Sequence, residues 1–257
     1  MKIIAVANQK GGAGKTTTAL NFALGLAASN RKILLIDMDG QCNLSFLLGI
    51  PNDTLQNSVK NIYSVLIGKY PITDCIISSH GVDIIPASPA LYEADLTINK
   101  VGKEYKLKKA LSAISDYDYI ILDTCPSLGI LTVNAFTAAD CVIIPVQAEL
   151  LSLVGLQQLA ETLDAVKEYC NPHLQINGIL VNRYQGRARL SQDFMGALQQ
   201  QAEMLGTKVY AVPIRESITV KEAQSLQQSI YEYGAKSAVT QDYHALIAEF
   251  LKGEEQA

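Results

Sequence analysis

The sequence lacks the features that would stabilise a secreted or metal-centred protein. Its five cysteines are scattered, odd in number and free of any C-x-x-C pair, which indicates reduced thiols in a cytosolic protein rather than a disulfide framework. Its three histidines lie far apart in the chain and offer no metal-ligand spacing. A cross-linked scaffold and a zinc-type centre are therefore not expected.

Long apolar runs are missing as well. No stretch approaches the ~20 apolar residues that a membrane-spanning helix needs. Only one residue separates Met1 from the apolar run 3–7, and a glycine-rich motif begins at residue 10, which leaves no room for a signal peptide. We therefore expect a cytoplasmic protein with a single domain over residues 1–257, no N-terminal DNA-binding extension and no membrane partner.

What is present suits one large α/β domain. The chain has 257 residues, of which 49% are hydrophobic and 18% are charged, so it can bury a large core. The formal net charge of −4 argues against a constitutive, sequence-blind nucleic-acid coat protein, although it is compatible with a local basic patch.

Apolar runs alternate with helix-length segments along the chain. Several runs are continuously apolar, which is typical of parallel strands covered on both faces. This order predicts right-handed crossovers and a doubly wound, mostly parallel central sheet of seven or eight strands with helices on both faces. The predicted strands are 3–7, 33–37, 82–85, 119–123, 141–146 and 176–181, with a short seventh near 208–212. The predicted helices are 15–28, 89–98, 104–115, 128–138, 152–170, 190–205 and 236–252, and residues 50–80 are predicted to be an irregular excursion.

The first predicted strand leads directly into the glycine-rich segment 10–18, KGGAGKTTT, and a helical segment follows. Strand, glycine-rich turn and helix N-terminus form the context of a phosphate-binding loop, in which glycines let backbone N–H groups point at a polyphosphate. Lys15 is placed to reach the β- and γ-phosphates, and Thr16 offers a hydroxyl to Mg²⁺. The expected nucleotide contacts are Lys10, Gly11, Gly12, Ala13, Gly14, Lys15, Thr16 and Thr17.

The ordinary form of this motif, G-x-x-x-x-G-K-[ST], begins with glycine. Here Gln9 takes that first position and Lys10 follows it. The pattern K-G-G-x-G-K-[ST] resembles the deviant Walker A ATPases, a family that includes ParA/Soj, MinD and the nitrogenase iron protein. The resemblance extends over essentially the whole chain and implies Mg²⁺-dependent ATP hydrolysis with slow intrinsic turnover. It also implies a nucleotide-sandwich homodimer in which Lys10 crosses the interface and contacts the nucleotide of the second subunit.

The segment after the second predicted strand, LLIDMDGQCN, resembles the first switch sequence of this family. The resemblance implies that Asp39 orients the attacking water and that Asp37 lies deeper, near the magnesium site. Gly40 and Cys42 depart from the family pattern, which has proline and glycine at these positions. If the usual glycine serves a backbone with positive φ, Cys42 predicts a different path for the loop.

Three further segments carry expected ligand contacts. In YDYIILDTCPSLG, Asp123 ends an apolar strand and is expected to hold the Mg²⁺ shell together with Thr16, since carboxylate and hydroxyl oxygens suit this ion. Cys125 stands where the family has proline. By resemblance, Asn182 and Pro213 are expected at the adenine site.

Cysteine and tyrosine positions exclude two members of the family. A nitrogenase-like protein needs two cluster-binding cysteines per subunit, and no cysteine lies between 75 and 125. A bacterial tyrosine kinase needs a C-terminal tyrosine cluster, and the last tyrosine is Tyr243. A MinD-like ATPase that acts on a membrane or protein scaffold stays open as an alternative, although the chain ends in glutamates rather than in a basic amphipathic helix.

A basic cluster favours the ParA/Soj-like alternative. Arg183, Arg187 and Arg189 lie within seven residues with no acid among them, and Arg215 follows later. Guanidinium groups neutralise phosphates and so give sequence-blind DNA binding. The competing interpretation is a solvated loop whose arginines pair with nearby acids such as Glu216.

We therefore predict a nucleoid-associated partitioning ATPase for a chromosome or plasmid. ATP drives dimerisation, the dimer binds nonspecific double-stranded DNA, and a ParB-like centromere-binding protein or an analogous adaptor triggers hydrolysis and release. Lys10, Lys15 and Asp39 are the expected catalytic residues, because the lysines stabilise charge on the transferred phosphoryl group and Asp39 positions water.

Overall fold

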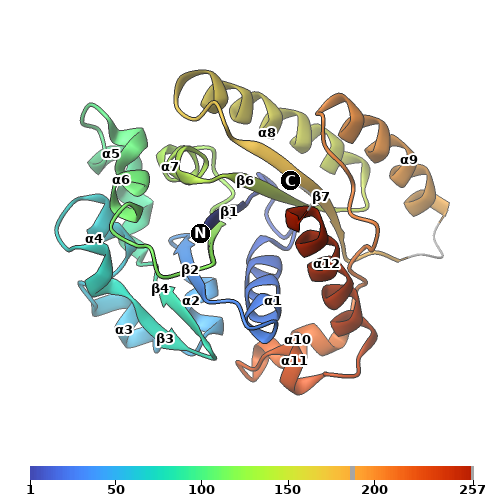
Figure 1. The fold of residues 1–257 in the computed structure, drawn as a ribbon, viewed down its shortest axis with the longest axis horizontal. Helices are drawn as coiled ribbons and strands as arrows, with labels where there is room; N and C mark the ends of the chain where they lie inside the picture. Colours follow the sequence, from blue (N-terminus) through green and yellow to red (C-terminus); the bar gives the residue numbers. More distant parts are fainter. Residues whose placement is uncertain (186–188, 256–257) are drawn as a thin grey trace.

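The computed structural model describes residues 1–185 and 189–255, and its centre is a seven-stranded sheet (Figure 1). The strand order across the sheet is β3-β4-β2-β5-β1-β6-β7, and every neighbouring pair is parallel except β3 and β4. This order confirms the doubly wound, mostly parallel sheet. The strands are β1 (Lys2–Val6), β2 (Ile33–Met38), β3 (Ile77–Ser79), β4 (Val82–Ile85), β5 (Tyr119–Thr124), β6 (Cys141–Gln147) and β7 (Gln175–Asn182).

Helices cover both faces of the sheet, as predicted. On one face α1 (Lys15–Ala28) packs against β5 and against α12 (Ala238–Glu255). On the other face α7 (Ile130–Ala138) contacts β1 and α8 (Leu150–Tyr169) (Figure 1). The other described helices are α2 (Asn43–Leu47), α3 (Asn52–Asn57), α4 (Ile62–Leu66), α5 (Ala94–Thr97), α6 (Lys106–Leu111), α9 (Arg189–Met204), α10 (Ile218–Ser225) and α11 (Ile230–Tyr233), with 3₁₀ segments η1 (Ile72–Cys75), η2 (Pro89–Glu93) and η3 (Lys103–Tyr105).

The continuously apolar strands form the core. Every residue of β2 and β5 is buried, because helices cover both faces of these central strands. The buried acids of β2 and β5, Asp37 and Asp123, lie near the carboxyl ends of these strands, where parallel neighbours finish at one edge of the sheet. None of the described helices combines the length and the apolar character that crossing a bilayer requires.

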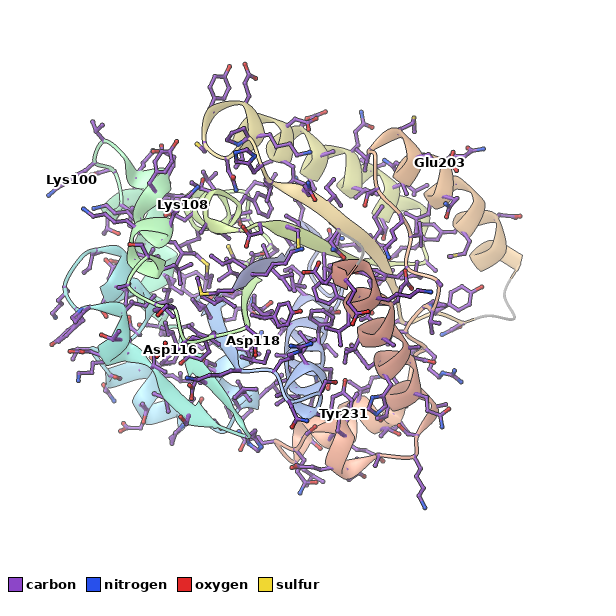
Figure 2. The ribbon with its side chains drawn as sticks, in the orientation of Figure 1. Lys100, Lys108, Asp116, Asp118, Glu203 and Tyr231 are labelled. Atoms are coloured by element: carbon purple, nitrogen blue, oxygen red, sulfur yellow. The ribbon has the colours of Figure 1, made fainter. Side chains whose placement is uncertain are left out.

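The first and last helices of the described chain pack closely against each other. Phe22 of α1 and Phe250 of α12 meet edge to face with 5.0 Å between ring centroids. One turn further along α1, a Cβ atom at Gly25 would overlap the side chains of Ile247 and Tyr231. Tyr231 donates a hydrogen bond of 2.9 Å to a main-chain carbonyl of α1 (Figure 2). Elements that lie late in the sequence therefore fix the helix that follows the glycine-rich loop.

The prediction of a strand near residues 208–212 is wrong. Only Val209 of this segment bridges the sheet, opposite Ile179, and the following Pro213 has no N–H with which to extend a ladder. The seventh strand is β3, which forms an antiparallel hairpin with β4. Its two-residue turn, His80 and Gly81, has φ of 49° and 76°, the type I′ conformation that tight hairpins prefer.

The segment 50–80 contains regular elements that the sequence did not indicate. It holds α3, α4, η1 and the edge strand β3. The helix α4 begins with a capping box, in which Asn61 and Ser64 exchange side-chain to backbone hydrogen bonds. These helices are four to six residues long, too short to give a periodic apolar pattern.

Candidate active site

The expected phosphate loop lies between the carboxyl end of β1 and the first turn of α1. Gly12 has φ of 78° and Gly14, the residue before α1, has φ of 90°; only glycine adopts such values without steric cost. Asn8 braces the start of the loop, because its amide donates to the carbonyl of Pro145 at 2.7 Å and its oxygen accepts the Lys10 N–H at 2.9 Å. The loop is therefore preformed around a helix N-terminus, where backbone N–H groups attract anions.

Lys15 is the first residue of α1 and is only 7% exposed. Its ammonium donates to the carbonyl of Lys10 at 3.3 Å, which places the side chain over the loop. Burial lowers the pKa of Lys15, and the carboxylates of Asp123 and Asp39 oppose this shift. A bound phosphate would supply the nearby negative charge that stabilises the protonated lysine.

Two glutamines that the sequence did not single out hold the loop from outside. The amide of Gln147, at the end of β6, donates to the carbonyl of Gly12 at 2.6 Å. The amide of Gln224, in α10, donates to the hydroxyl of Thr17 at 3.1 Å. Neither residue belongs to a motif, so only the fold could show that they reach the site.

Two buried aspartates lie beside the loop at the carboxyl ends of β2 and β5. Asp37 and Asp123 occupy paired positions in the register of the two strands, and both are fully buried. Asp37 accepts hydrogen bonds from the N–H of Ser45 at 2.9 Å and from its hydroxyl at 2.7 Å. Burial nevertheless raises the pKa of Asp37 to about 6.

Asp123 has no comparable support. In the described part of the chain, neither of its carboxylate oxygens has a hydrogen-bond partner. Burial and the neighbouring Asp37 raise the pKa of Asp123 well above its usual range, while Thr16 and Lys15 act in the opposite direction. A buried carboxylate without partners is costly unless a cation compensates it.

The oxygen atoms of this site, from Asp123 and Thr16, suit Mg²⁺. They suit less well a metal that protein ligands alone would have to hold. Among the described residues, no group of three or more His, Cys, Asp and Glu side chains is arranged to hold a metal. Mg²⁺ is usually held by one or two protein oxygens and completed by water and phosphate. The free carboxylate of Asp123 and the neighbouring hydroxyl of Thr16 fit this pattern.

Residues 39–42, which we name the Asp39 loop, follow β2. Asp39 is half-buried, and its carboxylate accepts the Gln41 N–H at 3.0 Å. Cys42 has φ of 57°, so the cysteine itself takes the left-handed conformation. The prediction of a different loop path at Cys42 is therefore wrong. Cys42 adopts the positive φ itself and bears the steric cost of this conformation. Burial raises the pKa of the Cys42 thiol to about 12, which leaves it unreactive at neutral pH.

A cavity of about 220 Å³ opens on the other side of the loop. Asn182, the last residue of β7, lines it and donates to the carbonyl of Ala13 at 3.1 Å and the hydroxyl of Thr18 at 3.0 Å. The side-chain oxygen of Asn182 has no partner among the described residues, so it can still accept a hydrogen bond. Pro213 does not line the cavity, whereas its neighbour Ile214 does.

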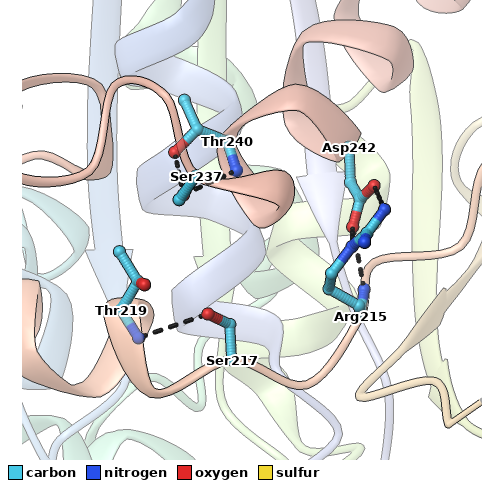
Figure 3. A network of polar contacts seen from close by, with 6 residues as sticks. All are labelled: Arg215, Ser217, Thr219, Ser237, Thr240 and Asp242. Atoms are coloured by element: carbon cyan, nitrogen blue, oxygen red, sulfur yellow. Dashed lines mark hydrogen bonds and ion pairs between the residues drawn. The ribbon is translucent and has the colours of Figure 1, made fainter.

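Part of the cavity wall comes from α10 and α12, where the sequence indicated no site residue. α10 and the loop before it contribute several side chains, and α12 contributes Tyr243. Ser217 is a local signal in this region, because its hydroxyl caps α10 by accepting the Thr219 N–H at 3.2 Å (Figure 3). The remaining lining residues are Gly12, Gly14, Thr17, Arg183, Arg215, Glu216, Val220, Lys221 and Gln224.

Lys10, the residue expected to act across a dimer interface, has a partner within its own chain. Its ammonium forms an ion pair with the carboxylate of Glu149, the residue before α8. Both side chains are partly exposed. In the single chain, Lys10 is therefore held beside its own phosphate loop.

The described arginines of the expected DNA-binding cluster are paired with acids. Arg183 contacts Glu216 at 2.9 Å. Arg215 makes two bonds of 2.7 Å to the carboxylate of Asp242 in α12 (Figure 3). Arg189 begins α9, but its side chain is not described, and Arg187 lies outside the described residues. Pairing with Glu216, the competing interpretation of the sequence, is thus present for Arg183.

Comparison with known proteins supports the same family. A family model described as an AAA domain matches residues 1–176. The chain is 38% identical to the chromosome partitioning protein ParA of Caulobacter vibrioides, over 99% of this chain and 95% of that protein. It is 37% identical to the sporulation initiation inhibitor protein Soj of Bacillus subtilis, over 96% and 97% of the two chains.

A solved structure extends the likeness to three dimensions. Cobyrinic acid a,c-diamide synthase from Mycobacterium smegmatis, with a bound ATP analogue and magnesium, matches with a TM-score of 0.86 at 32% identity, over 99% of this chain and 96% of that one. The similarity to ParA and Soj spans the phosphate loop, both acidic strand ends and the C-terminal helices. The chain therefore belongs to the ParA/Soj family of P-loop partitioning ATPases.

Proposed function

We propose that this chain hydrolyses ATP with Mg²⁺, slowly on its own, and that ATP joins two copies into a dimer that binds nonspecific double-stranded DNA. The observation that carries the proposal is the unpartnered carboxylate of Asp123, buried beside Lys15 and a preformed phosphate loop. A hydrated cation and a polyphosphate would compensate both buried charges. The ATP analogue and magnesium bound to the solved relative support this choice of ligands.

The proposed reaction is an in-line attack of water on the γ-phosphate of ATP. Lys15 and the N–H groups of the loop stabilise the charge that builds on the phosphate oxygens. Asp39 accepts a hydrogen bond from the attacking water and so directs it. Mg²⁺, when bound by Thr16 and near Asp123, neutralises charge between the β- and γ-phosphates. Lys10 leaves Glu149 and reaches the nucleotide of the second copy.

The proposed DNA surface consists of Arg183, Arg187, Arg189 and Arg215. Exposed ion pairs such as that of Arg183 with Glu216 contribute little stability, so a phosphate can replace the carboxylate at small cost. One copy offers few phosphate contacts and should bind weakly. A dimer doubles the contacts, and affinity rises steeply with the number of phosphates neutralised. A ParB-like centromere-binding protein or an analogous adaptor would then trigger hydrolysis and release.

The packing of α12 favours DNA over the membrane surface of the MinD-like alternative. The apolar side of this helix, which includes Tyr243, Leu246, Ile247 and Phe250, is buried against the rest of the molecule. An interfacial helix must present such a side to lipid. Here that side already covers α1.

An anisotropy titration of random duplex DNA with increasing salt tests the proposal. We expect ATP-dependent binding at low salt, with log affinity falling by about 0.9 per phosphate contact for each unit of log salt. Arg187→Glu should weaken binding to every duplex alike and flatten the salt dependence, while ATP-driven dimerisation stays intact.

Arg31→Glu provides the matched control, because it makes the same charge change at an exposed residue. Arg31 follows the C-terminal end of α1, whereas the phosphate loop precedes its N-terminal end. The Arg31→Glu variant should bind DNA like the unmodified protein. Absence of ATP-dependent binding at low salt, or equal binding by Arg187→Glu, would reject the DNA surface and favour a scaffold or membrane as the partner.

A further inference from the structure

A nine-residue segment contacts both loops that carry the acids of the site. This segment, residues 89–97, consists of η2 and α5 and lies outside the phosphate loop and both acidic strands. One of the two loops is the Asp39 loop. The other, which we name the Cys125 loop (residues 125–129), connects the end of β5 near Asp123 to the start of α7.

The first contact joins the 89–97 segment to the Asp39 loop. A Cβ atom added to Gly40 would lie 3.1 Å from the ring of Tyr92, which is closer than ordinary van der Waals contact. Because residue 40 is glycine, the ring lies directly on its backbone, and a side chain there would push the ring outward by a few tenths of an ångström. The rest of the ring is open, since Tyr92 is 68% exposed.

The second contact joins the segment to the Cys125 loop. The carboxylate of Asp95 accepts the N–H of Ile130, the first residue of α7, at 2.7 Å. The residue before α7, Gly129, provides no side-chain cap, so Asp95 supplies this cap from another element. A Cβ atom at Gly129 would lie only 2.6 Å from the Asp95 carboxylate. The absence of a side chain at Gly129 thus permits the contact.

The two loops and the segment enclose one cavity of about 210 Å³. Asp39 and Gly40 line it from the first loop, Cys125 and Ser127 from the second, and Tyr92 from the segment. Since one short segment touches both loops around this space, a shift of either loop must displace the segment or break one of its contacts.

We propose that the 89–97 segment couples the two loops, and that Tyr92 and Asp95 are positioning residues for ATP hydrolysis. The inference rests on the proposed ATPase mechanism, in which Asp39 orients water and Asp123 lies near Mg²⁺. Tyr92 fixes the loop that contains Asp39, and Asp95 fixes the loop that follows Asp123. Through this segment, the position of the Asp39 carboxylate depends on the position of the Cys125 loop, which follows Asp123.

The absence of tryptophan from the chain allows a direct test. Tyr92→Trp introduces the sole indole of the protein at the contact with Gly40. We expect its emission to shift when ATP and Mg²⁺ are added. In this background, Asp95→Ala should abolish most of the shift and lower kcat about tenfold with little change in KM. The variant removes the hydrogen bond from Ile130 that joins the segment to the Cys125 loop, and the loss of an N-cap weakens such a contact by about tenfold. Calorimetry with a non-hydrolysable ATP analogue measures nucleotide binding separately.

Three further variants separate coupling from stability. Asp95→Asn keeps an oxygen that can accept the Ile130 N–H, so it should restore the shift and most of kcat. Gly129→Ala places a methyl group against the Asp95 carboxylate and so displaces it. This variant should lose the emission shift, as Asp95→Ala does. Asp164→Asn, a change at an exposed acid of α8 outside the site, should behave like its parent.

The outcomes distinguish this inference from the proposed function. No nucleotide binding by calorimetry overturns both. Binding without any emission shift, or a full shift and unchanged kcat in Asp95→Ala and Gly129→Ala, overturns the coupling and leaves the ATPase proposal standing. A variant that loses only thermal stability, with its shift intact, shows that Asp95 merely caps α7 and also overturns the coupling.

Discussion

At the scale of single residues, Asp123 stands out because its buried position is costly to the free protein. Its carboxylate is fully buried and its oxygens have no hydrogen-bond partner among the described residues. Burial raises the pKa of Asp123 well above its usual range, whereas in the unfolded chain this group ionises near pH 4. The folded protein therefore holds a proton that the unfolded chain releases, and its stability falls as pH rises above about 4.

Asp123→Asn should therefore stabilise the nucleotide-free protein. We expect a gain of about 1–3 kcal/mol in the free energy of unfolding at pH 8, because an ionisable group without partners is removed from the interior. The gain should shrink as the pH falls toward 4, because the raised pKa lets the folded carboxyl regain its proton before the unfolded one does. Urea unfolding at several pH values measures this difference. The same variant should lose the extra stability that Mg²⁺ and ATP give the unmodified protein, and a gain independent of pH would contradict the argument.

The residues of the phosphate loop and Asn182 beside the cavity could be named from the sequence, whereas other residues of the cavity wall could not. Lys15, Thr16 and the glycines are adjacent in the chain, and their chemistry depends on that local spacing. Tyr243 reaches this site because α12 packs on α1, and Gln224 of α10 reaches it through its hydrogen bond to Thr17. No local pattern contains that information. The roles of Asp39 and Lys10 stay predictions, since they concern bound states.

At the scale of elements, the contact between α1 and α12 depends on a glycine inside a helix. Gly25 costs helical propensity, yet a larger residue would overlap Ile247 of α12 and Tyr231 of α11. Gly25→Ala should lower the free energy of unfolding by about 1–3 kcal/mol, because the overlap outweighs the gain in propensity. Gly196→Ala in α9 is the matched control, since a Cβ there meets nothing within 4 Å, and it should be neutral or stabilising by up to about 1 kcal/mol.

Denaturant unfolding of the two alanine variants compares these effects directly. Equal stability of Gly25→Ala and the unmodified protein would show that α12 can move away from α1 without cost. A loss of ATP affinity in Gly25→Ala is also expected, because Tyr243 of α12 lines the cavity beside the loop.

Long elements were predictable and short ones were not. The predicted helix 15–28 matches α1 residue for residue, and the parallel strands follow from their continuous apolar runs. The hairpin of β3 and β4 was missed because its turn is His80-Gly81 rather than the more familiar Asn-Gly. Helices such as α3 and α11 have four to six residues, and packing against longer elements decides whether they form.

At the scale of the whole molecule, the ion pair between Lys10 and Glu149 bears on assembly. If Lys10 acts on the nucleotide of a second copy, this internal pair must break first. Lys10→Ala should bind ATP yet dimerise poorly. Glu149→Gln should dimerise at an ATP concentration about two- to fivefold lower, which corresponds to the modest strength of a partly exposed ion pair.

Light scattering after size exclusion, over a series of ATP concentrations, measures both effects. Glu161→Gln, an exposed change in α8, the helix that Glu149 precedes, is the control and should leave the midpoint unchanged. A Lys10→Ala protein that dimerises normally would remove the reason to assign this lysine to an interface.

The fold also has a consequence for how the protein is made. α1 leaves the ribosome before the other described helices, and α12, which covers its apolar side, is the last of them to do so. Nearly the whole chain must be synthesised before Phe22 meets Phe250. During that interval the nascent chain exposes an apolar surface of the kind that chaperones bind, and slow translation would prolong the exposure. Yield in the cell should therefore depend on chaperone supply more than the stability of the finished molecule alone implies.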